Sequence, residues 1–473
     1  MFIQNELTSN DYISSNNIND NFISLFNKPG PYYTSYPVLG EWNDFEDTVS
    51  YENALLDFFS SSSSKPLYLY LHIPYCAKLC YYCGCQISIS NNRGIINNFV
   101  QCLIKEIKML EKFFLQNKIT PNIKEIHLGG GTPSHLTTDE LDSIIKALEN
   151  FVNFKGLQEF SMEVDPRTVN FEHFDYYEAM GVDRISFGIQ DFNDVVQEKI
   201  NRVQPYQLIE RLMNEEVRDK FRGVNFDLLF GLPMQTRDSL RETIELTKQL
   251  SPERITLLKY LHIPNKVKHM KMINESSLPN KSDLPYMFVD STEALIEAGY
   301  SWVGIDHFAK QTDSLSIAKD NGKVSRNFGG VNPGYTKDII SLGPSSTSAF
   351  GNYYFQATSN LLKYKNTINE GHFAISRKYK LNSDDIIRRE CNFELQCNQK
   401  LDMTKIENDY KICFQKYFSK ELELLKDFEE KGLVYINDKN IVVTTTGRYF
   451  VRHICRLFDT ILDSTMPYQP HGT

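Results

Sequence analysis

Residues 67–85 read LYLYLHIPYCAKLCYYCGC and join a strand-like run to a loop with four of the nine cysteines. Apart from His72, the run from 67 to 73 is aliphatic or aromatic, a pattern typical of a buried strand. Cys76, Cys80 and Cys83 follow it at spacings of four and three residues, and Cys85 comes two residues later. In a long chain without a secretory signal, such a cluster indicates a metal site rather than disulfides.

The spacing of these thiols bears on which metal they would bind. Thiolates suit zinc or iron–sulfur clusters, but a structural zinc takes four ligands, often as two pairs, and no second pair lies at a suitable distance. A four-iron cluster ordinarily takes four thiolates, so three would leave one iron open to a cofactor or substrate. Cys85 is the obvious fourth thiol, yet its tight spacing from Cys83 makes joint chelation awkward. We therefore expect an iron–sulfur cluster held by Cys76, Cys80 and Cys83.

Strand and helix patterns alternate along the rest of the first 360 residues. Apolar residues at spacings of three and four predict a helix over residues 99–114, and Thr137 with Glu140 predicts a capping box. Such alternation predicts parallel βα units, hence an α/β fold that is either a barrel or an open sheet. The further predicted strands are residues 125–128, 159–164, 184–189, 224–230, 254–260 and 302–305.

The two ends of the chain differ from this middle part. Residues 1–30 are polar and predict an arm, PGPYYTSYP (29–37) predicts an ordered loop, and the serines at 60–64 predict a linker. After about residue 360, helices are predicted at 383–395, 419–432 and 447–459 around a hairpin at 433–443, which resembles a winged-helix module. We divide the chain into an N-terminal arm (1–50), an α/β domain (51–370) and a mostly helical C-terminal domain (371–473).

Composition limits the partners of the chain. Its 51 basic and 60 acidic residues give a formal charge of −9, which argues against a general nucleic-acid or anionic-membrane surface. No apolar run approaches the roughly 18 residues that span a bilayer, and the first residues lack the features of a secretory signal. We expect a cytoplasmic chain. Arg448, Arg452 and Arg456 recur at a spacing of four, which predicts a solvated helical face.

Cys-x3-Cys-x2-Cys with an aromatic residue before the third cysteine resembles the signature of radical S-adenosylmethionine (SAM) enzymes. The longer YLHIPYCAKLCYYCGC is similar to a narrower family, the oxygen-independent coproporphyrinogen III oxidases (coproporphyrinogen dehydrogenases). The resemblance runs from about residue 28 to 462 and implies a partial (β/α) barrel with an N-terminal arm and a small C-terminal domain. Further similar stretches, in the same order, are GPYYTSYP, GGGTP, MEVDPR, SFGIQDFN, NFDLLFGLP, GIDHFA and VTTTGRYFVRHICRLFDT.

The resemblance also implies the cofactors and their contacts. Cys76, Cys80 and Cys83 would hold a 4Fe-4S cluster, and the family holds two SAM molecules beside it. The first SAM would be bound by Tyr70, Gly130, Glu163 and Thr347. The second would be bound by Tyr82, Gly131, Thr132, Gln190, Arg202, Asp227 and Leu261. Independently of the resemblance, a carboxylate such as Asp227 on an apolar strand is expected to have a ligand or a partner.

The function implied by the resemblance is the oxygen-independent oxidative decarboxylation of coproporphyrinogen III. Two propionates become vinyl groups, giving protoporphyrinogen IX in haem biosynthesis, and the radical derives from SAM and the cluster. An external electron donor is implied, and we expect a monomer that binds neither nucleic acid nor membrane. Candidate cations for the anionic tetrapyrrole are Arg326, Lys259, His72 and His307.

Three departures from the family pattern keep alternatives open. Tyr32 replaces an arginine, Gly329 replaces a glutamine, and Leu261 replaces a small residue. One alternative is a radical SAM paralogue that acts as a methyltransferase or opens a haem macrocycle. Others are a tetrapyrrole-binding chaperone and a winged-helix nucleic-acid binder.

Overall fold

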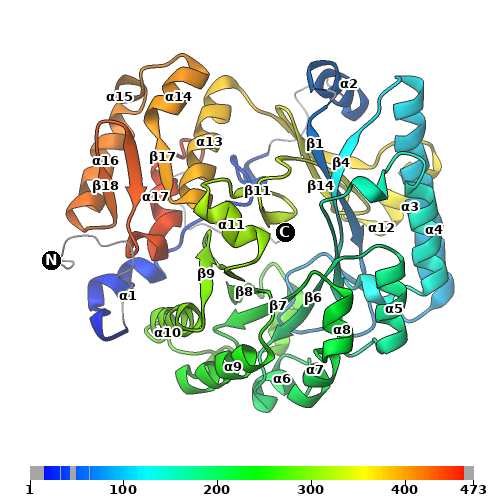
Figure 1. The fold of residues 1–473 in the computed structure, drawn as a ribbon, viewed down its shortest axis with the longest axis horizontal. Helices are drawn as coiled ribbons and strands as arrows, with labels where there is room; N and C mark the ends of the chain where they lie inside the picture. Colours follow the sequence, from blue (N-terminus) through cyan, green and yellow to red (C-terminus); the bar gives the residue numbers. More distant parts are fainter. Residues whose placement is uncertain (1–14, 32, 43–49, 63, 463–473) are drawn as a thin grey trace.

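The computed structural model describes residues 15–31, 33–42, 50–62 and 64–462 (Figure 1). A 12-stranded sheet runs in the order β16-β15-β14-β13-β1-β4-β5-β6-β7-β8-β10-β9. Its strands from β13 to β8 are mutually parallel, and those beyond them on both sides are antiparallel. Figure 1 shows the sheet curving without closing, with helices on its outside. The predicted partial α/β barrel is therefore confirmed.

The large sheet includes every strand that the sequence predicted in the first 360 residues. The parallel ones are β13 (Asp338–Leu342), β1 (Pro66–Ile73), β4 (Asn122–Gly130), β5 (Glu159–Val164), β6 (Arg184–Gln190), β7 (Gly223–Phe230) and β8 (Arg254–Lys259). The antiparallel ones are β9 (Tyr300–Val303), β10 (His307–Lys310), β14 (Thr347–Phe350), β15 (Tyr353–Ala357) and β16 (Ile375–Lys380). Two small pairs are β2 (Tyr75–Cys76) with β3 (Ser88–Ile89) and β11 (Ser325–Asn327) with β12 (Gly330–Asn332).

The helices of the barrel follow the predicted amphipathic patterns. The capping box at Thr137 and Glu140 is present and begins α4. The predicted linker at 60–64 is wrong in its first part, because the helix α2 continues to Ser62. The barrel helices are α2 (Tyr51–Ser62), α3 (Arg93–Gln116), α4 (Thr138–Leu148), α5 (Phe171–Ala179), α6 (Asp194–Lys199), α7 (Tyr206–Leu212), α8 (Glu215–Lys220), α9 (Arg237–Leu250), α10 (Leu284–Glu297), α11 (Ser314–Asp320) and α12 (Leu361–Asn369).

The C-terminal domain has a hydrophobic core of its own, which includes Leu395, Leu425 and Phe458. A three-stranded antiparallel sheet packs with its helices, and the predicted hairpin forms two of the strands. This arrangement agrees with the winged-helix-like expectation. Its elements are α13 (Ser383–Asn398), β17 (Lys400–Asp402), α14 (Met403–Tyr410), α15 (Phe414–Tyr417), α16 (Ser419–Glu430), β18 (Val434–Ile436), β19 (Asn440–Val443) and α17 (Val451–Leu457).

The domain limits 1–50, 51–370 and 371–473 stay a prediction. Strand pairing bears on the second limit, since β16 pairs with β15 at the edge of the large sheet. We propose that the C-terminal domain begins after β16.

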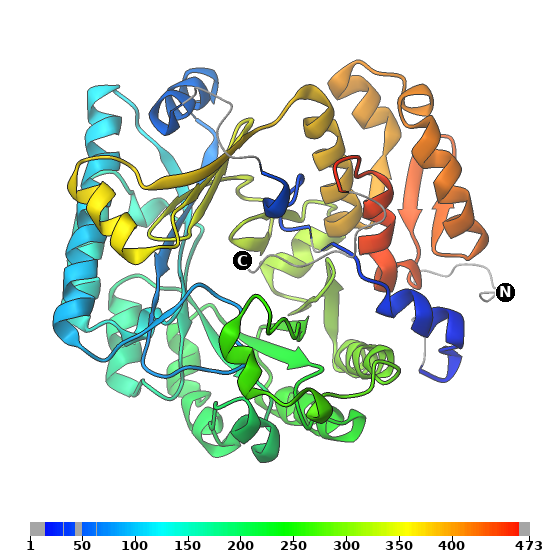
Figure 2. The same cartoon turned by 180° about the vertical axis from the view of Figure 1, so that it is seen from behind.

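The N-terminal arm crosses from the C-terminal domain to the barrel, as Figure 2 shows. Its helix α1 (Asp20–Asn27) places Phe22 against Phe450, with ring centroids 4.7 Å apart. Farther along, the Tyr33 hydroxyl donates to the Asp459 carboxylate at 2.7 Å. The described part of the predicted loop at 29–37 is irregular and ordered by such contacts.

The arginines at spacing four do not form the predicted solvated face. Arg448 is buried, and its guanidinium lies 3.9 Å from the ring centroid of Trp302. The same guanidinium donates to the Trp302 carbonyl at 2.7 Å. Arg456 donates to the backbone carbonyl of Asp459. Spacing alone could not predict this, because Arg448 lies in the 3-10 turn before α17 and contacts Trp302 of the edge strand β9.

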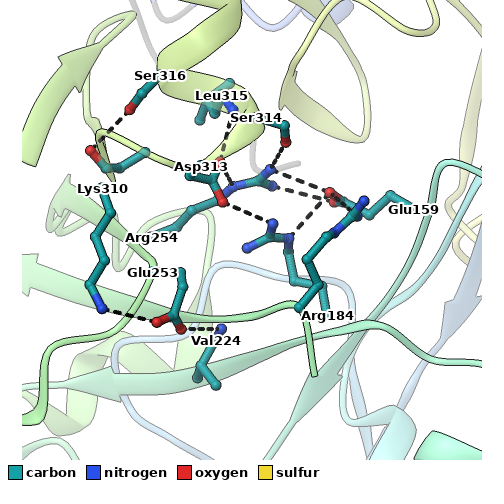
Figure 3. A network of polar contacts seen from close by, with 12 residues as sticks. Glu159, Arg184, Val224, Glu253, Arg254, Lys310, Asp313, Ser314, Leu315 and Ser316 are labelled. Atoms are coloured by element: carbon teal, nitrogen blue, oxygen red, sulfur yellow. Dashed lines mark hydrogen bonds and ion pairs between the residues drawn. The ribbon is translucent and has the colours of Figure 1, made fainter. Parts of the chain in front are cut away.

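A network of ion pairs lies at the amino ends of the parallel strands (Figure 3). Glu159, Arg184 and Arg254 are the first residues of β5, β6 and β8. Asp313 accepts from Arg184 Nη2 at 2.9 Å and from Arg254 Nε at 2.8 Å. Although burial acts against ionisation, Arg254 and Arg184 hold the pKa of Glu159 at about 2. The network therefore consists of charged groups that are paired inside the protein.

The side chain of Glu125 lies beside this network, but its nearest charged neighbour on the adjacent strand is another carboxylate, Glu159. It pairs with Glu159 in the register of β4 and β5 and accepts a hydrogen bond from the Thr336 hydroxyl at 3.1 Å. Burial, followed by the negative charge of Glu159, raises the pKa of Glu125 to about 8. The carboxyl is therefore protonated in the folded protein at neutral pH.

This proton makes stability depend on pH. The unfolded chain releases it near pH 4.5 and the folded protein only near pH 8, so stability is lost as pH rises through that window. We expect on the order of 3–5 kcal/mol of unfolding free energy to be lost in this way. Glu125→Gln should remove that part of the pH dependence, measured by urea unfolding from pH 5 to 9. The exposed Glu149→Gln is the control, and an unchanged slope in Glu125→Gln would contradict the assignment.

Candidate active site

The carboxyl ends of the parallel strands bring the predicted site residues to one end of the barrel. In the strand register, Tyr70 lies opposite His127, and Glu163 lies opposite Ser186. Asp227 lies opposite Gly188 on one side and Thr256 on the other. Because paired residues point to the same face of a sheet, these side chains share the inner face of the barrel. Barrel enzymes place their chemistry at this end.

The cysteine loop begins where β2 ends, directly above this face. The Tyr81 N–H donates to the Ile200 carbonyl at 3.0 Å, just after α6. On its other side, His269 Nε2 lies 2.7 Å from the Cys83 carbonyl oxygen. The loop is therefore held by two segments that are far from it in sequence.

The thiols of the loop differ in their surroundings. Cys76 and Cys80 are buried, Cys83 is half-buried and Cys85 is exposed. Burial raises the pKa of Cys76 to about 12, although the Thr132 hydroxyl donates to its sulfur at 3.1 Å. Within the described ranges, no group of three His, Cys, Asp or Glu side chains is placed to hold a metal ion. Three thiols from one short loop are nevertheless the donor set of an iron–sulfur cluster, so the residues fit such a cluster.

Three of the residues predicted to bind the first SAM gather around Gly130. Its N–H donates to Glu163 Oε2 at 3.0 Å. Gly130 has φ +110°, and a Cβ there would lie 2.5 Å from the His72 ring, so only glycine fits. The Tyr70 hydroxyl lies 3.1 Å from His72 Nδ1. Tyr70, Gly130 and Glu163 therefore share one neighbourhood with His72.

Thr347 reaches this neighbourhood from the other side of β1. Its carbonyl accepts from the Ser341 hydroxyl at 2.6 Å, and Ser341 pairs with Tyr70 across β13 and β1. The structure therefore places Thr347 two strands from Tyr70, with β13 between them.

The residues predicted to bind the second SAM lie on β6 and β7, in the cysteine loop, and in the segments after β4, β6 and β8, with Gly131 and Thr132 directly after β4. Gln190 sits at an irregularity in the pairing of β6 with β7 and has φ +67°. Arg202 Nε donates to the Gly188 carbonyl at 2.9 Å. Tyr82 belongs to the cysteine loop, and Leu261 follows β8 with 42% of its surface exposed.

Asp227 is half-buried and has partners within the protein, as expected of a carboxylate on an apolar strand. It accepts from the Ser186 hydroxyl at 2.9 Å and from Asn225 Nδ2 at 2.8 Å. Burial and the nearby Glu163 carboxylate raise the pKa of Asp227. Arg202 contacts other groups, with Nη1 3.7 Å from Asp165 and 3.6 Å from the Cys80 sulfur.

Two residues at the cysteine loop were not assigned from the sequence. Asp165 follows β5, and Arg167 grips its carboxylate with Nε and Nη2 at 2.9 and 2.6 Å. Arg167 Nη2 also lies 3.8 Å from the Cys80 sulfur. Both residues belong to MEVDPR, a stretch already noted for its resemblance. The position of this stretch directly after a predicted strand is the signal from which these two residues could have been found.

The three departures have different structural contexts. Tyr32 lies outside the described residues. Gly329 packs against the ring of Tyr68, which a Cβ at this position would approach to 2.7 Å. A side chain at 329 would therefore displace that ring. Leu261 is exposed at the same end of the barrel as the cysteine loop.

The candidate substrate cations do not converge. His72 and His307 lie on the inner face, where His307 Nδ1 is 2.6 Å from Asp306 Oδ1. Lys259 lies over the Phe26 ring of α1, at 5.4 Å from its centroid. Arg326 lies on β11 and lines a cavity of about 300 Å³ near the amino end of β13. The structure therefore does not bring Lys259 and Arg326 to the cysteine loop.

The described residues include no helix long and apolar enough to cross a membrane. A three-thiol loop at the carboxyl ends of an open parallel barrel defines the radical SAM class. Residues 70–247 match the family model of the Radical SAM superfamily, and residues 381–450 match that of the HemN C-terminal domain.

Curated relatives and a solved structure make the class narrower. The oxygen-independent coproporphyrinogen III oxidases of Salmonella typhimurium and Helicobacter pylori are each 34% identical to the chain. These alignments cover 93% of the chain and 94% or 96% of the relative. The structure of coproporphyrinogen III oxidase (HemN) from Escherichia coli, a radical SAM enzyme, superposes with a TM-score of 0.86 at 35% identity. That match covers 91% of this chain and 98% of the other. The chain belongs to the oxygen-independent coproporphyrinogen III oxidase family.

Proposed function

We propose that this protein converts coproporphyrinogen III to protoporphyrinogen IX without oxygen, by oxidative decarboxylation of two propionate side chains. The observation that carries the proposal is the three-thiol loop set over a polar inner face that includes Tyr70, Glu163 and Asp227. Similarity to the named relatives extends over 93% of the chain in sequence and 91% in structure. The other classes considered from the sequence gain no support from these features.

We propose that Cys76, Cys80 and Cys83 hold a 4Fe-4S cluster and that two SAM molecules bind beside it. When bound, the cluster and SAM supply the radical that removes hydrogen from the substrate. Tyr70, Gly130, Glu163 and Thr347 would hold the first SAM. Tyr82, Gly131, Thr132, Gln190, Arg202, Asp227 and Leu261 would hold the second.

The chain's own residues would bind, orient and shield these groups. The Gly130 backbone can approach an amino-acid moiety closely, since it lacks a Cβ, and Glu163 is positioned by the same N–H. A carboxylate at Asp227 and a guanidinium at Arg202 are complementary to the ammonium and carboxylate of a zwitterion. At the opposite end of the barrel, the side chains of the ionic network are themselves mostly buried.

The remaining partners are proposed from the same chemistry. A one-electron donor must reduce the cluster from outside, and the substrate is an anionic tetrapyrrole. We propose a monomer that acts in the cytoplasm, where thiols stay reduced. Of the candidate cations, the inner face retains His307, whereas burial lowers the pKa of His72 and favours its neutral form.

The test is an anaerobic incubation of the reconstituted protein with SAM, dithionite and coproporphyrinogen III, followed by mass spectrometry. We expect loss of two carbon dioxide molecules and four hydrogen atoms per tetrapyrrole. A methylated tetrapyrrole with S-adenosylhomocysteine would instead indicate a methyltransferase. An opened macrocycle would indicate ring cleavage, and unchanged substrate that stays bound would indicate a chaperone.

A further inference from the structure

We propose that Arg167, held by Asp165, raises the reduction potential of the iron–sulfur cluster by donating to the sulfur of Cys80. Arg167 is thus a positioning residue that acts through a cluster ligand. The inference rests on the proposed cluster and is independent of the tetrapyrrole substrate.

The geometry fixes the guanidinium of Arg167 toward one thiol. Its Nε and Nη2 bind the two Asp165 oxygens, and its backbone N–H donates to Asp165 Oδ1 at 3.0 Å. Nη2 then faces the Cys80 sulfur at 3.8 Å. The backbone of Asp165 is also held in place, because its N–H donates to the Ser134 hydroxyl oxygen at 2.9 Å. The fork is therefore oriented before any cofactor binds.

The charge around Cys80 is positive. Arg202 Nη1 lies 3.6 Å from the same sulfur and 3.7 Å from the Asp165 carboxylate. Two guanidinium groups and one carboxylate leave a net charge of +1 beside a ligand sulfur. The side chains of Arg167, Arg202 and Asp165 are 16%, 9% and 9% exposed, so solvent screens this charge weakly.

The effect on the potential follows from electrostatics. A reduced cluster carries one more negative charge than an oxidised one, and a nearby cation with an N–H donor stabilises the reduced state more. Hydrogen bonds to sulfur and net charge are among the factors that set the potential of such clusters. Arg202 is already proposed to contact SAM, whereas Arg167 has no other assigned role beyond the ion pair with Asp165. A substitution of Arg167 therefore tests the effect on the reduction potential of the cluster without changing a residue proposed to bind SAM.

The test is a redox titration of the reconstituted protein without SAM, followed by the electron paramagnetic resonance signal of the reduced cluster. In Arg167→Gln we expect the equilibrium constant for one-electron reduction to fall about tenfold, which corresponds to about 59 mV. Arg167→Lys keeps the charge but loses the fork, so we expect about a threefold fall. Lys78→Gln is the matched control, because it removes one positive charge from an exposed position between Cys76 and Cys80. We expect it to shift the constant by less than twofold.

The outcomes separate this inference from the proposed function. An Arg167→Gln constant within twofold of wild type, or an equal shift in Lys78→Gln, would overturn it. If Arg167→Gln fails to retain iron, Arg167→Lys carries the test, and an unshifted constant there would overturn it. Loss of iron in both variants would mean that Arg167 holds the cluster rather than tunes it. A wild type that binds no four-iron cluster would instead refute the proposed function.

Discussion

Alanine in place of Cys76, Cys80 or Cys83 is expected to remove nearly all cluster iron and the associated brown absorbance. Each thiol supplies one of the three protein ligands, and the loop offers no spare donor in the same position. Without the cluster no radical is generated, so product formation should fall below detection. Iron analysis after anaerobic reconstitution, with circular dichroism to verify the fold, measures the effect.

The control is Cys85, which lies two residues beyond Cys83 and is exposed. Cys85→Ala should retain most of the iron, because the tight spacing hinders joint chelation. Equal iron loss in Cys85→Ala and in the other three variants would make Cys85 a ligand. The argument for an iron with an open coordination position would then fail.

Removing the charge of Asp227 is expected to abolish product formation while the cluster and reductive SAM cleavage persist. The cysteine loop lies about 150 residues earlier, so its geometry need not change. Loss of one charged contact should weaken binding of the proposed second SAM by roughly 1.5–3 kcal/mol, about ten- to hundred-fold. Because Asp227 accepts from Ser186 and Asn225, Asp227→Asn is preferable to alanine, which would remove the acceptor of both hydrogen bonds. Equilibrium dialysis with SAM and assays of 5′-deoxyadenosine and product measure these effects.

Ser186→Ala is the matched control for Asp227→Asn. It removes a hydrogen bond to the same carboxylate but keeps the negative charge, so SAM stoichiometry should stay at two. A wild-type stoichiometry of one would reject the two-SAM proposal at the outset. Asp227→Asn with full product formation would show that this charge is not needed.

The fold was predictable because its signals are local. Buried strands such as residues 67–73 and 224–230 are short apolar runs, and their alternation with amphipathic helices predicts parallel pairing. The capping box at Thr137 is likewise encoded within four residues. By contrast, the burial of Arg448 depends on Trp302, which lies 146 residues away. The periodicity of the last predicted helix does not predict the contact between Arg448 and Trp302.

The candidate site likewise has parts that local sequence predicts and parts that depend on contacts between distant residues. The cysteine loop was evident from spacing, and the resemblance supplied residues that the strand register brings to one end of the barrel. The contacts of Arg202 were not predictable, since a partner at Asp165 rather than Asp227 depends on how two loops approach each other. Arg167 was overlooked for the same reason. Lys259 was misplaced because alternate residues of β8 face opposite sides of the sheet.

The arm that joins the two ends of the chain sets an order of events during synthesis. Tyr33 and Asp459, which share a hydrogen bond, are 426 positions apart. At the usual pace of translation, roughly 20–90 s separate their appearance. The cysteine loop and the barrel strands emerge within that interval, so the nascent arm can meet the barrel, through contacts such as Phe26 with Phe288, before its C-terminal docking surface exists. Assembly of the metal centre can therefore begin on a chain whose first segment is only partly docked, and the contact of the arm with the C-terminal domain is among the last steps of maturation.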